Sequence, residues 1–460
     1  MAPARVADDS KGLSTMLAVS RYTLHTSADR HHYFFNTLSG ASLVLDDAHY
    51  ATLRAVLDKT PEDLHSAAES GIAELMLQSG LLVEASTDEL AAALTQYDDR
   101  RHATDTMSVV VTPTLSCNMS CFYCYQDRES TERLSAGDAG AIVGFIGERL
   151  AANGRLDVTW FGGEPLLALP FVTAVSRELI ALAAARGARY GARVISNCYH
   201  LDEAAIAMLE QCAVDRIQVT FDGPQQIHDR VRRSLDAAAG SRTGSFARIV
   251  DNLRQACRHF TIVARVNVTE RNVDRVPELI DQLAEAGLHD ALAAIYFAPA
   301  YSYTTTAPKV SYAPRPGVHL RMQSFAETEV VLLRHAAARG FTLRNPLQAG
   351  YAGCIAVQEN GFVIDANGDI KKCTNDVSRP ATALASLRPH DGDFAAAYTA
   401  SYDAFRPESD AGCRDCQLLP VCYSACPQRS MLSDEDRRDK CPSHKYNWRQ
   451  TLPMFLSQQR

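Results

Sequence analysis

Residues 115–125 read LSCNMSCFYCY, a stretch that brings together three thiols, Cys117, Cys121 and Cys124. Thiolates this close along a chain converge on one metal centre, and soft sulfur selects zinc, copper(I) or an iron–sulfur cluster. A closed tetrahedral zinc site takes four ligands, whereas three thiolates can hold an iron–sulfur cubane and leave one iron open. The C-x3-C-x2-C spacing therefore favours an iron–sulfur cluster over structural zinc.

Composition limits the classes of protein to consider. The chain has 460 residues, 46% of them hydrophobic, which is enough for two or three domains with substantial cores. Its formal net charge of −8 disfavours a nucleic-acid enzyme, whose surface is normally basic. No apolar run approaches the ~18 residues of a membrane span, and residues 1–12 are too polar for a signal peptide. Thirteen cysteines in such a chain indicate metal binding in the reducing cytoplasm rather than disulfides.

The N-terminal part has its own pattern. Residues 1–17 have the composition of a disordered tail. Residues 18–86 read as short strands, two segments with apolar residues at helical spacing, and a final apolar run. We expect a small winged-helix-like unit there, followed by a polar linker helix within residues 87–105.

From residue 106 onward, strand-like and helix-like segments alternate. The expected strands are residues 109–111, 156–161, 192–195, 216–221, 262–268 and 292–297. About six strand–helix repeats predict a parallel α/β sheet. A short polar motif follows most of these strands, and parallel barrels place their chemistry on that rim. The predicted fold is α/β, with a partial (β/α)6 TIM-like barrel over residues 106–345.

The three-cysteine loop resembles the cluster loop of the radical S-adenosylmethionine (SAM) enzymes. In that family the open iron chelates SAM, and an electron from the cluster cleaves SAM to a 5′-deoxyadenosyl radical. The resemblance implies that Cys117, Cys121 and Cys124 hold the SAM-cleaving [4Fe–4S] cluster. It extends to residues 162–165, GGEP, which are similar to the stretch that binds the amino group of SAM.

Other positions are similar to SAM-contacting residues of the family. Residues 222–232 follow its D-G-P-x3-H-D-x2-R pattern, while Cys198 stands where glycine is more usual. An ion pair at the surface is the alternative role for the arginine, and His228 and Asp229 are expected to be structural. The SAM contacts implied by the resemblance are Tyr123, Gly162, Gly163, Glu164, Ser196, Asn197, Thr220 and Arg232.

Residues 346–460 contain seven cysteines in the pattern C-x13-G-x4-C, C-x2-C-x5-C-x3-C and a final C. This pattern matches the SPASM extension of radical SAM enzymes that modify peptides and proteins; a zinc ribbon is the alternative for the middle four. The resemblance implies two auxiliary [4Fe–4S] clusters, one held by Cys413, Cys416, Cys422 and Cys441, the other by Cys354, Cys373, Cys426 and a ligand that the pattern does not name.

The resemblance as a whole implies a radical SAM/SPASM peptide maturase. Such an enzyme removes a hydrogen atom from a ribosomally made precursor peptide and oxidises it, most often to a thioether, C–C or C–O crosslink. Residues 18–86 resemble the leader-recognition domain of such enzymes, and the expected reductant is a flavodoxin or ferredoxin. We expect a cytoplasmic enzyme with no nucleic-acid or membrane partner.

Three other functions compete with this one. A peptide epimerase would use the same cofactors. An anaerobic sulfatase-maturating enzyme is disfavoured because its aspartate directly follows the cysteine of G-x4-C, where Thr374 stands here. The third is a zinc-bound structural protein. Cys198, Cys212 and Cys257 belong to none of the cluster motifs and are expected to be small buried residues.

Overall fold

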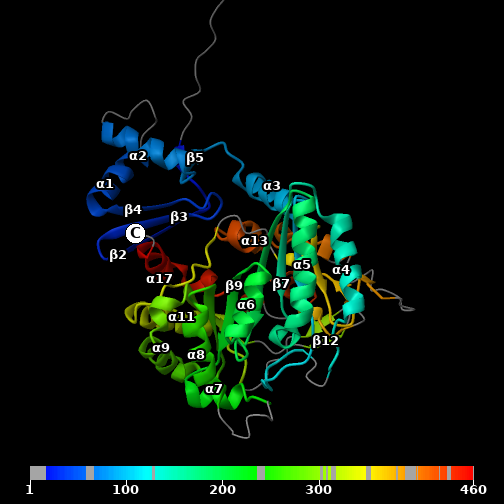
Figure 1. Ribbon diagram of the computed structural model, residues 1–460. Coiled ribbons are helices and arrows are strands. Elements are labelled where there is room, and N and C mark those ends of the chain that lie inside the picture. The colour runs from blue at the N-terminus through cyan, green and yellow to red at the C-terminus, as the bar shows by residue number, and fades with distance from the viewer. Residues whose placement is uncertain are drawn as a thin grey trace, which may run out of the picture.

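The central feature is a nine-stranded sheet of order β11-β10-β9-β8-β7-β6-β14-β15-β16 (Figure 1). The computed structural model describes residues 17–57, 67–126, 130–235, 244–300, 304–306, 309–311, 317–348, 354–379, 382–388, 400, 402–423, 425–432 and 437–458. The tail expected over residues 1–17 therefore lies, but for its last residue, outside the described residues.

Six neighbouring strands of the sheet run parallel, each beside the next in sequence, which confirms the predicted strand–helix repeat. They are β6 (Thr106–Val111), β7 (Arg155–Trp160), β8 (Arg189–Ser196), β9 (Val214–Phe221), β10 (Thr261–Val268) and β11 (Ala294–Pro299). The helices between them are α4 (Ala136–Arg149), α5 (Leu169–Ala185), α6 (Glu203–Gln211), α7 (Gln225–Val231), α8 (Ser245–Ala256), α9 (Val276–Glu285) and α10 (Leu288–Ala291).

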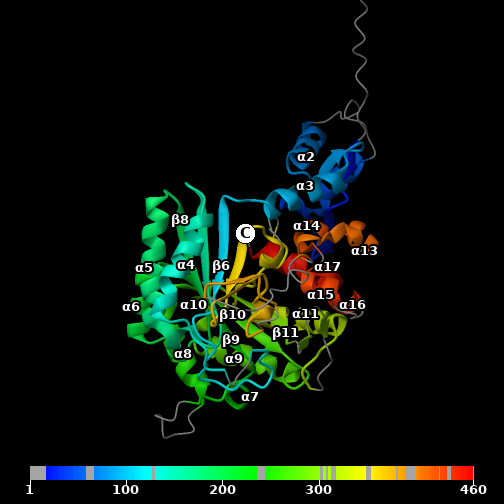
Figure 2. The same ribbon diagram turned by 90° about the vertical axis from the view of Figure 1, so that its right-hand side faces the viewer.

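The two faces of the sheet differ in polarity because side chains alternate along each strand. In β10, Ile262, Ala264 and Val266 are fully buried, whereas Arg265 and Asn267 point to the other face. Helices α4, α5, α6 and α8 cover the apolar face (Figure 2). The polar face therefore remains available to line a cavity.

Helix α4 begins after Ser135. Asp138 accepts hydrogen bonds from the backbone N–H and the hydroxyl of Ser135, both at 2.7 Å. Pairing the first-turn aspartate with the preceding serine satisfies donors that a helix start otherwise leaves unpaired. Arg388 also donates to Asp138, at 2.7 Å.

Helix α5 and the turn before it, Pro165–Ala185, form the one helix in the described part of the chain that is long and apolar enough to cross a membrane. Its inward side chains, among them Val172, Val175 and Leu179, belong to the main core. We interpret it as a core helix of the α/β unit.

The last three strands of the sheet come from the C-terminal region. Strand β14 (Gly361–Ile364) pairs parallel to β6, and β15 (Asp369–Lys371) and β16 (Ala385–Ser386) follow antiparallel. The sequence analysis places these residues in a separate domain. Strands β14 and β6 pair although they lie about two hundred and fifty residues apart along the chain. Local sequence patterns do not encode a pairing over such a separation.

The N-terminal unit has the expected order of strands and helices. A meander of β2 (Thr23–Ala28), β3 (His31–Asn36) and β4 (Ser42–Asp46) is followed by α1 (Asp47–Leu57) and α2 (Ala67–Gln78). Strand β5 (Leu82–Glu84) then returns to pair with β1 (Leu17–Val19). The winged-helix-like assignment and the domain boundaries stay predictions.

Helix α3 (Glu89–Arg101) forms where a linker helix is expected, but it is packed rather than solvated. The buried guanidinium of Arg101 donates to the carbonyl oxygens of Tyr402, Asp403 and Phe405. The rings of Tyr97 and Tyr423 lie 4.7 Å apart between centroids. The helix therefore joins the N-terminal unit firmly to the C-terminal region.

The C-terminal helices lie on the cavity side of the sheet, beneath the N-terminal unit (Figure 2). Leu24 and Phe35 of the N-terminal meander share a core with Trp448 and Leu452 of the last helix. The helices of this region are α11 (Met322–Ala338), α13 (Ala411–Arg414), α14 (Leu419–Cys422), α15 (Pro427–Leu432), α16 (Arg437–Lys440) and α17 (His444–Ser457).

Candidate active site

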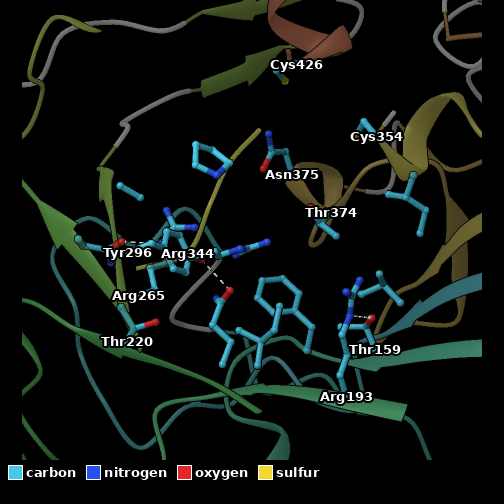
Figure 3. Close-up of a pocket in the computed structure, with 18 of the residues that line it drawn as sticks. Thr159, Arg193, Thr220, Arg265, Tyr296, Arg344, Cys354, Thr374, Asn375 and Cys426 are labelled. Atoms are coloured by element: carbon cyan, nitrogen blue, oxygen red, sulfur yellow. Dashed lines mark hydrogen bonds between the residues drawn. The ribbon is translucent and has the colours of Figure 1, made fainter. Parts of the chain in front are cut away.

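A cavity of about 1370 Å³ lies between the polar face of the sheet and the C-terminal region. It is lined by all eleven residues that the sequence assigns to the SAM-cleaving cluster and to SAM. They are Cys117, Cys121, Tyr123, Cys124, Gly162, Gly163, Glu164, Ser196, Asn197, Thr220 and Arg232. Figure 3 shows Thr220 at the lower side of this cavity, opposite Cys354 and Cys426. Residues far apart in sequence thus meet around one space.

The two glycines of the GGEP stretch pack against the cysteine loop. A Cβ on Gly163 would lie 2.2 Å from the carbonyl oxygen of Ser116 and 2.4 Å from that of Leu115. Gly162 has a φ of +125°, a conformation that side chains oppose. The resemblance implies that these glycines contact SAM, and the structure shows that both also pack closely on the chain's own residues near the cysteine loop.

Glu164 ties the end of β7 to the end of β8. Its carboxylate accepts hydrogen bonds from the hydroxyl of Ser196 and the N–H of Asn197, each at 2.8 Å, and from the N–H of Leu166 at 3.0 Å. The side chain is buried, and burial raises the pKa of Glu164. The contact of this carboxylate with SAM therefore remains a prediction, while its role in holding the rim together is clear.

Arg232 forms a buried ion pair. An ion pair at the surface is the alternative role that the sequence offers for this arginine. Its guanidinium pairs with Asp222, and the side chains are 10% and 1% exposed. The hydroxyl of Tyr123 donates to both oxygens of Asp222 at 2.7 Å and accepts from Arg232 and Asn267 at 3.0 Å. This network fixes the side chain of Tyr123, a residue for which the resemblance implies a SAM contact.

The cysteine loop has the donor set that an iron–sulfur cluster needs. Burial raises the pKa of Cys117 to about 12 and that of Cys121 to about 11, so their thiolates require a cation nearby. In the described part of the chain, no three His, Cys, Asp or Glu side chains converge tightly enough to hold one metal ion. The ligands of a cubane are spread over several irons, so they need not meet at one point.

The C-terminal cysteines fall into two groups that match the predicted sets. Cys413, Cys416, Cys422 and Cys441 line a second cavity of about 1040 Å³, and the ammonium group of Lys445 donates to the sulfur of Cys416 at 3.0 Å. The other three cysteines lie together as well, because Cys354 and Cys426 each contribute to the raised pKa of Cys373. Cys354, Cys422 and Cys426 also line the main cavity. The assignment of clusters to these groups stays a prediction.

The three remaining cysteines lie outside the cluster motifs, and Asp229 contacts the start of a helix. None of the thirteen cysteines is in a disulfide. Cys198 and Cys212 are fully buried and Cys257 is partly buried. Cys198 has a φ of +60°, in the left-handed region that favours glycine, which agrees with glycine being usual at this position. Asp229 accepts the N–H of Phe246 at 2.8 Å and so holds the start of α8.

One cavity residue that the sequence analysis missed is Glu329 on α11. Its carboxylate accepts a hydrogen bond from the side-chain amide of Asn447 at 2.9 Å. Burial raises the pKa of Glu329 from 4.5 to about 7. Nothing around it in the sequence distinguishes it from other helix glutamates, because its environment is built by α17.

Replacing Gly163 with alanine is expected to displace the cysteine loop. The new Cβ would meet two backbone oxygens that cannot rotate away. Misplacing reacting groups by ~1 Å can cost ~100-fold in rate, so we expect at least about a tenfold loss of SAM cleavage. Gly144→Ala is the control, since nothing lies within 4 Å of its Cβ position on α4. Iron content and SAM cleavage of the two variants measure the effect; equal values would contradict it.

Replacing Glu329 with glutamine is expected to change how stability depends on pH. A carboxyl whose folded pKa is raised stabilises the fold at low pH, and this contribution is lost as pH rises from about 4.5 through about 7. Wild type should therefore lose up to about 3 kcal/mol relative to Glu329→Gln over that range. Urea unfolding between pH 5 and 8.5 measures it, with the exposed Glu327→Gln as the control, which should behave like wild type.

The comparisons with known proteins agree with this geometry. Residues 111–283 match the Radical SAM superfamily. The sporulation killing factor maturation protein SkfB of Bacillus subtilis (strain 168) is 25% identical over 275 residues, which are 56% of this chain and 60% of SkfB. The Fe-coproporphyrin III synthase of Methanosarcina barkeri (strain Fusaro / DSM 804) is 26% identical over 182 residues, or 38% of this chain and 41% of the synthase. The chain thus spans less than two thirds of each relative.

Solved structures show the same fold. Native anSMEcpe with bound AdoMet and Cp18Cys peptide superposes with a TM-score of 0.56 at 15% identity, covering 76% of this chain and 98% of that one. The superfamily match runs from the end of β6 through most of α9, and it contains the cysteine loop, the GGEP stretch and the Asp222–Arg232 pair. The part of the chain that matches the Radical SAM superfamily is therefore the part that holds the candidate site.

Proposed function

We propose that the protein is a SPASM-type peptide maturase that oxidatively crosslinks a ribosomally made precursor peptide in the cytoplasm. The observation that carries this proposal is that one cavity is lined by Cys117, Cys121 and Cys124 and also by Cys354 and Cys426. A substrate in that cavity would lie between the cysteines assigned to the SAM-cleaving cluster and those assigned to an auxiliary cluster. A small flavodoxin- or ferredoxin-type protein would supply the electrons.

When bound, SAM and the clusters supply hydrogen-atom abstraction from an unactivated carbon and an acceptor for the second electron that crosslinking releases. The chain's own residues hold the geometry. The Tyr123–Asp222–Arg232 network and the Glu164 contacts with Ser196 fix the rim of the sheet on which the cysteine loop rests. The C-terminal helices and the loop at residues 374–375 enclose the opposite side of the cavity.

The N-terminal unit provides a place for the leader segment of the peptide. In the three-stranded sheet β2 adjoins α17, while β4 is the other edge and pairs only with β3 among the described residues. Asn36 donates its N–H to Ala41, and the alternation of an antiparallel ladder then points the N–H of Val44 outward. An added strand would bind such an edge through backbone hydrogen bonds.

Val44→Pro is expected to weaken binding of the precursor peptide by about tenfold. Proline removes the outward N–H and leaves the β3–β4 ladder in place, which edge strands tolerate, and one lost hydrogen bond contributes ~0.5–1.5 kcal/mol before the steric effect of the ring. Val44→Ala is the control because it shortens the same side chain and keeps the N–H. Calorimetry with the small peptide encoded beside this gene measures both; equal affinities would contradict binding at this edge. Deleting the whole unit would be less informative, because it shares a core with α17.

The sulfatase-maturating alternative requires an acid beside the G-x4-C cysteine. Thr374 occupies that position and lines the cavity, whereas the nearby Asp376 is fully buried and accepts a hydrogen bond from Gln428 at 3.0 Å. Asp376 is not among the residues that line the cavity. The contacts of the described residues therefore favour the peptide crosslinking reaction.

Mass spectrometry of the peptide encoded beside the gene, after anaerobic co-expression with the enzyme, tests the proposal. The expected result is loss of two hydrogen atoms, mapped by fragmentation to a linked pair of residues. An unchanged mass with deuterium taken up from solvent would instead indicate an epimerase. An untouched peptide with continued SAM cleavage would contradict peptide maturation and favour a protein substrate.

A further inference from the structure

Three arginines that belong to no family motif line the main cavity. Two lie on strands of the sheet, and the third follows a segment that pairs with the sheet. Arg193 lies on β8 and Arg265 on β10, both on the polar face, and Arg344 follows the segment that bridges to β11. Figure 3 shows Arg265 and Arg344 beside Tyr296, with Arg193 across the cavity near Thr159. All three line the cavity.

Each of these guanidinium groups is held at one side only. The Nε of Arg193 donates to the hydroxyl of Thr159 at 2.7 Å, and the Nε of Arg265 donates to the side-chain oxygen of Asn267 at 2.8 Å. The guanidinium carbon of Arg344 lies 4.7 Å from the centroid of the Tyr296 ring. These contacts orient the groups and leave their outer N–H donors turned to the cavity.

None of the three has a carboxylate partner within 4.0 Å, whereas other arginines of the cavity do. Arg155 pairs with Asp157 at 2.7 Å and Arg216 with Asp215 at 3.5 Å. Among the described residues, no ion pair includes any of these three arginines.

Three unpaired guanidinium groups facing one cavity are electrostatically unfavourable. Arginine stays charged at any physiological pH. Desolvation and the nearby charges of Arg216 and Arg344 lower the pKa of Arg193, although the carboxylates of Asp157 and Asp215 act in the opposite direction. Arg265 is half-buried, and Arg193 and Arg344 are exposed, so their donors are open to an anion that enters the cavity. Since guanidinium and carboxylate groups match in a bidentate geometry, a carboxylate is the anion that this site fits.

We propose that Arg265 and Arg344 bind a carboxylate of the peptide substrate, with Arg193 adding positive charge from across the cavity, and so position the residue to be modified. This inference rests on the proposed peptide substrate. Arg344 follows the segment that bridges to β11, the strand of the parallel sheet farthest in order from β6, whose loop carries the cysteines. We therefore assign Arg344, and Arg265 beside it, to the substrate rather than to SAM.

Three short peptides test the proposal on cluster-loaded enzyme with SAM present and without reductant. They are Ac-GGEGG-NH2, its neutral counterpart Ac-GGQGG-NH2, and Ac-GGGGG-OH, which carries only a C-terminal carboxylate. Calorimetry should give a Kd for the best carboxylate peptide at least about tenfold below that of the glutamine peptide, a typical gain for a charge-assisted pair. The carboxylate peptide that binds more tightly identifies the source as a side chain or a C-terminus.

Single Arg265→Gln and Arg344→Gln variants should reduce this preference to about twofold or less, and Arg265→Lys should keep part of it. The matched control is the double variant Asp215→Asn with Arg216→Gln, which leaves the net charge unchanged. It removes an ion-paired arginine from the same cavity and should keep the preference. The affinity for SAM, measured on each variant, should stay unchanged.

Three outcomes would overturn the proposal. Wild type shows no preference for either carboxylate peptide, or the preference survives the arginine substitutions, or the arginine variants lose affinity for SAM instead of the carboxylate preference. The peptides bind without turnover, so these results are independent of the mass change that tests maturation. The absence of a carboxylate preference does not contradict peptide maturation. An unmodified precursor does not contradict a measured carboxylate preference.

Discussion

Cys117→Ala is expected to abolish SAM cleavage, while Cys416→Ala is expected to keep SAM cleavage and to lose the crosslinked product. Cys117 lies in the loop that lines the main cavity with the SAM motifs, and Cys416 lines the second cavity with Cys413 and Cys441. Substitutions in outer shells of metal sites cost ~10–100-fold, so loss of a ligand should exceed that range.

Anaerobic assays of 5′-deoxyadenosine release, crosslinked peptide and bound iron separate the two variants. Each should lose about four iron atoms per chain, the content of one cubane. Cys257→Ala is the control, because it removes a partly buried thiol outside both cysteine groups and should retain iron and activity. Product formation by Cys416→Ala would contradict an electron-accepting role for the cluster in the second cavity.

Asp222→Asn is expected to lower the free energy of unfolding of the barrel by about 3–5 kcal/mol, because it leaves the buried Arg232 charge without its partner. A Trp448→Phe background makes Trp160, buried at the end of β7, the only tryptophan that reports on urea unfolding.

Two controls separate the loss of the pair from the loss of a charge. Asp251→Asn breaks an ion pair with Arg254 that is 69% and 51% exposed, and should change stability by less than about 1 kcal/mol. The double variant Asp222→Asn with Arg232→Met should recover much of the loss, because replacing both buried charges removes the unpaired one. A single variant as stable as Asp251→Asn would show that the pair contributes nothing.

The cysteine spacings and the strand–helix alternation could be interpreted from sequence because they are local. The C-x3-C-x2-C loop, the GGEP stretch and the DGP stretch each follow a strand, and all lie at one rim in the structure. Parallel strands bring their carboxyl ends together, so order along the chain was enough to predict this meeting.

The partners of individual side chains were not predictable in the same way. Arg232 pairs with Asp222, and Gly163 packs on the cysteine loop, although a ligand contact was expected for both. The raised pKa of Glu329 and the unpaired Arg344 depend on α17 and on the far end of the sheet. Such contacts join residues of different elements, as far as 118 positions apart for Glu329 and Asn447, and no local periodicity encodes them.

By itself, the sequence determined the six-fold repeat, the cysteine groups and the positions that are predicted to bind SAM, since each depends on residue type and short spacing. Tertiary structure alone decided that β14 extends the sheet from β6, that α3 and α17 join the first and last parts of the chain, and that Cys354 and Cys426 line the same cavity as the cysteine loop. The physical reason is that burial and pairing between distant segments minimise the free energy of the whole chain. No single segment determines which distant segment it will contact.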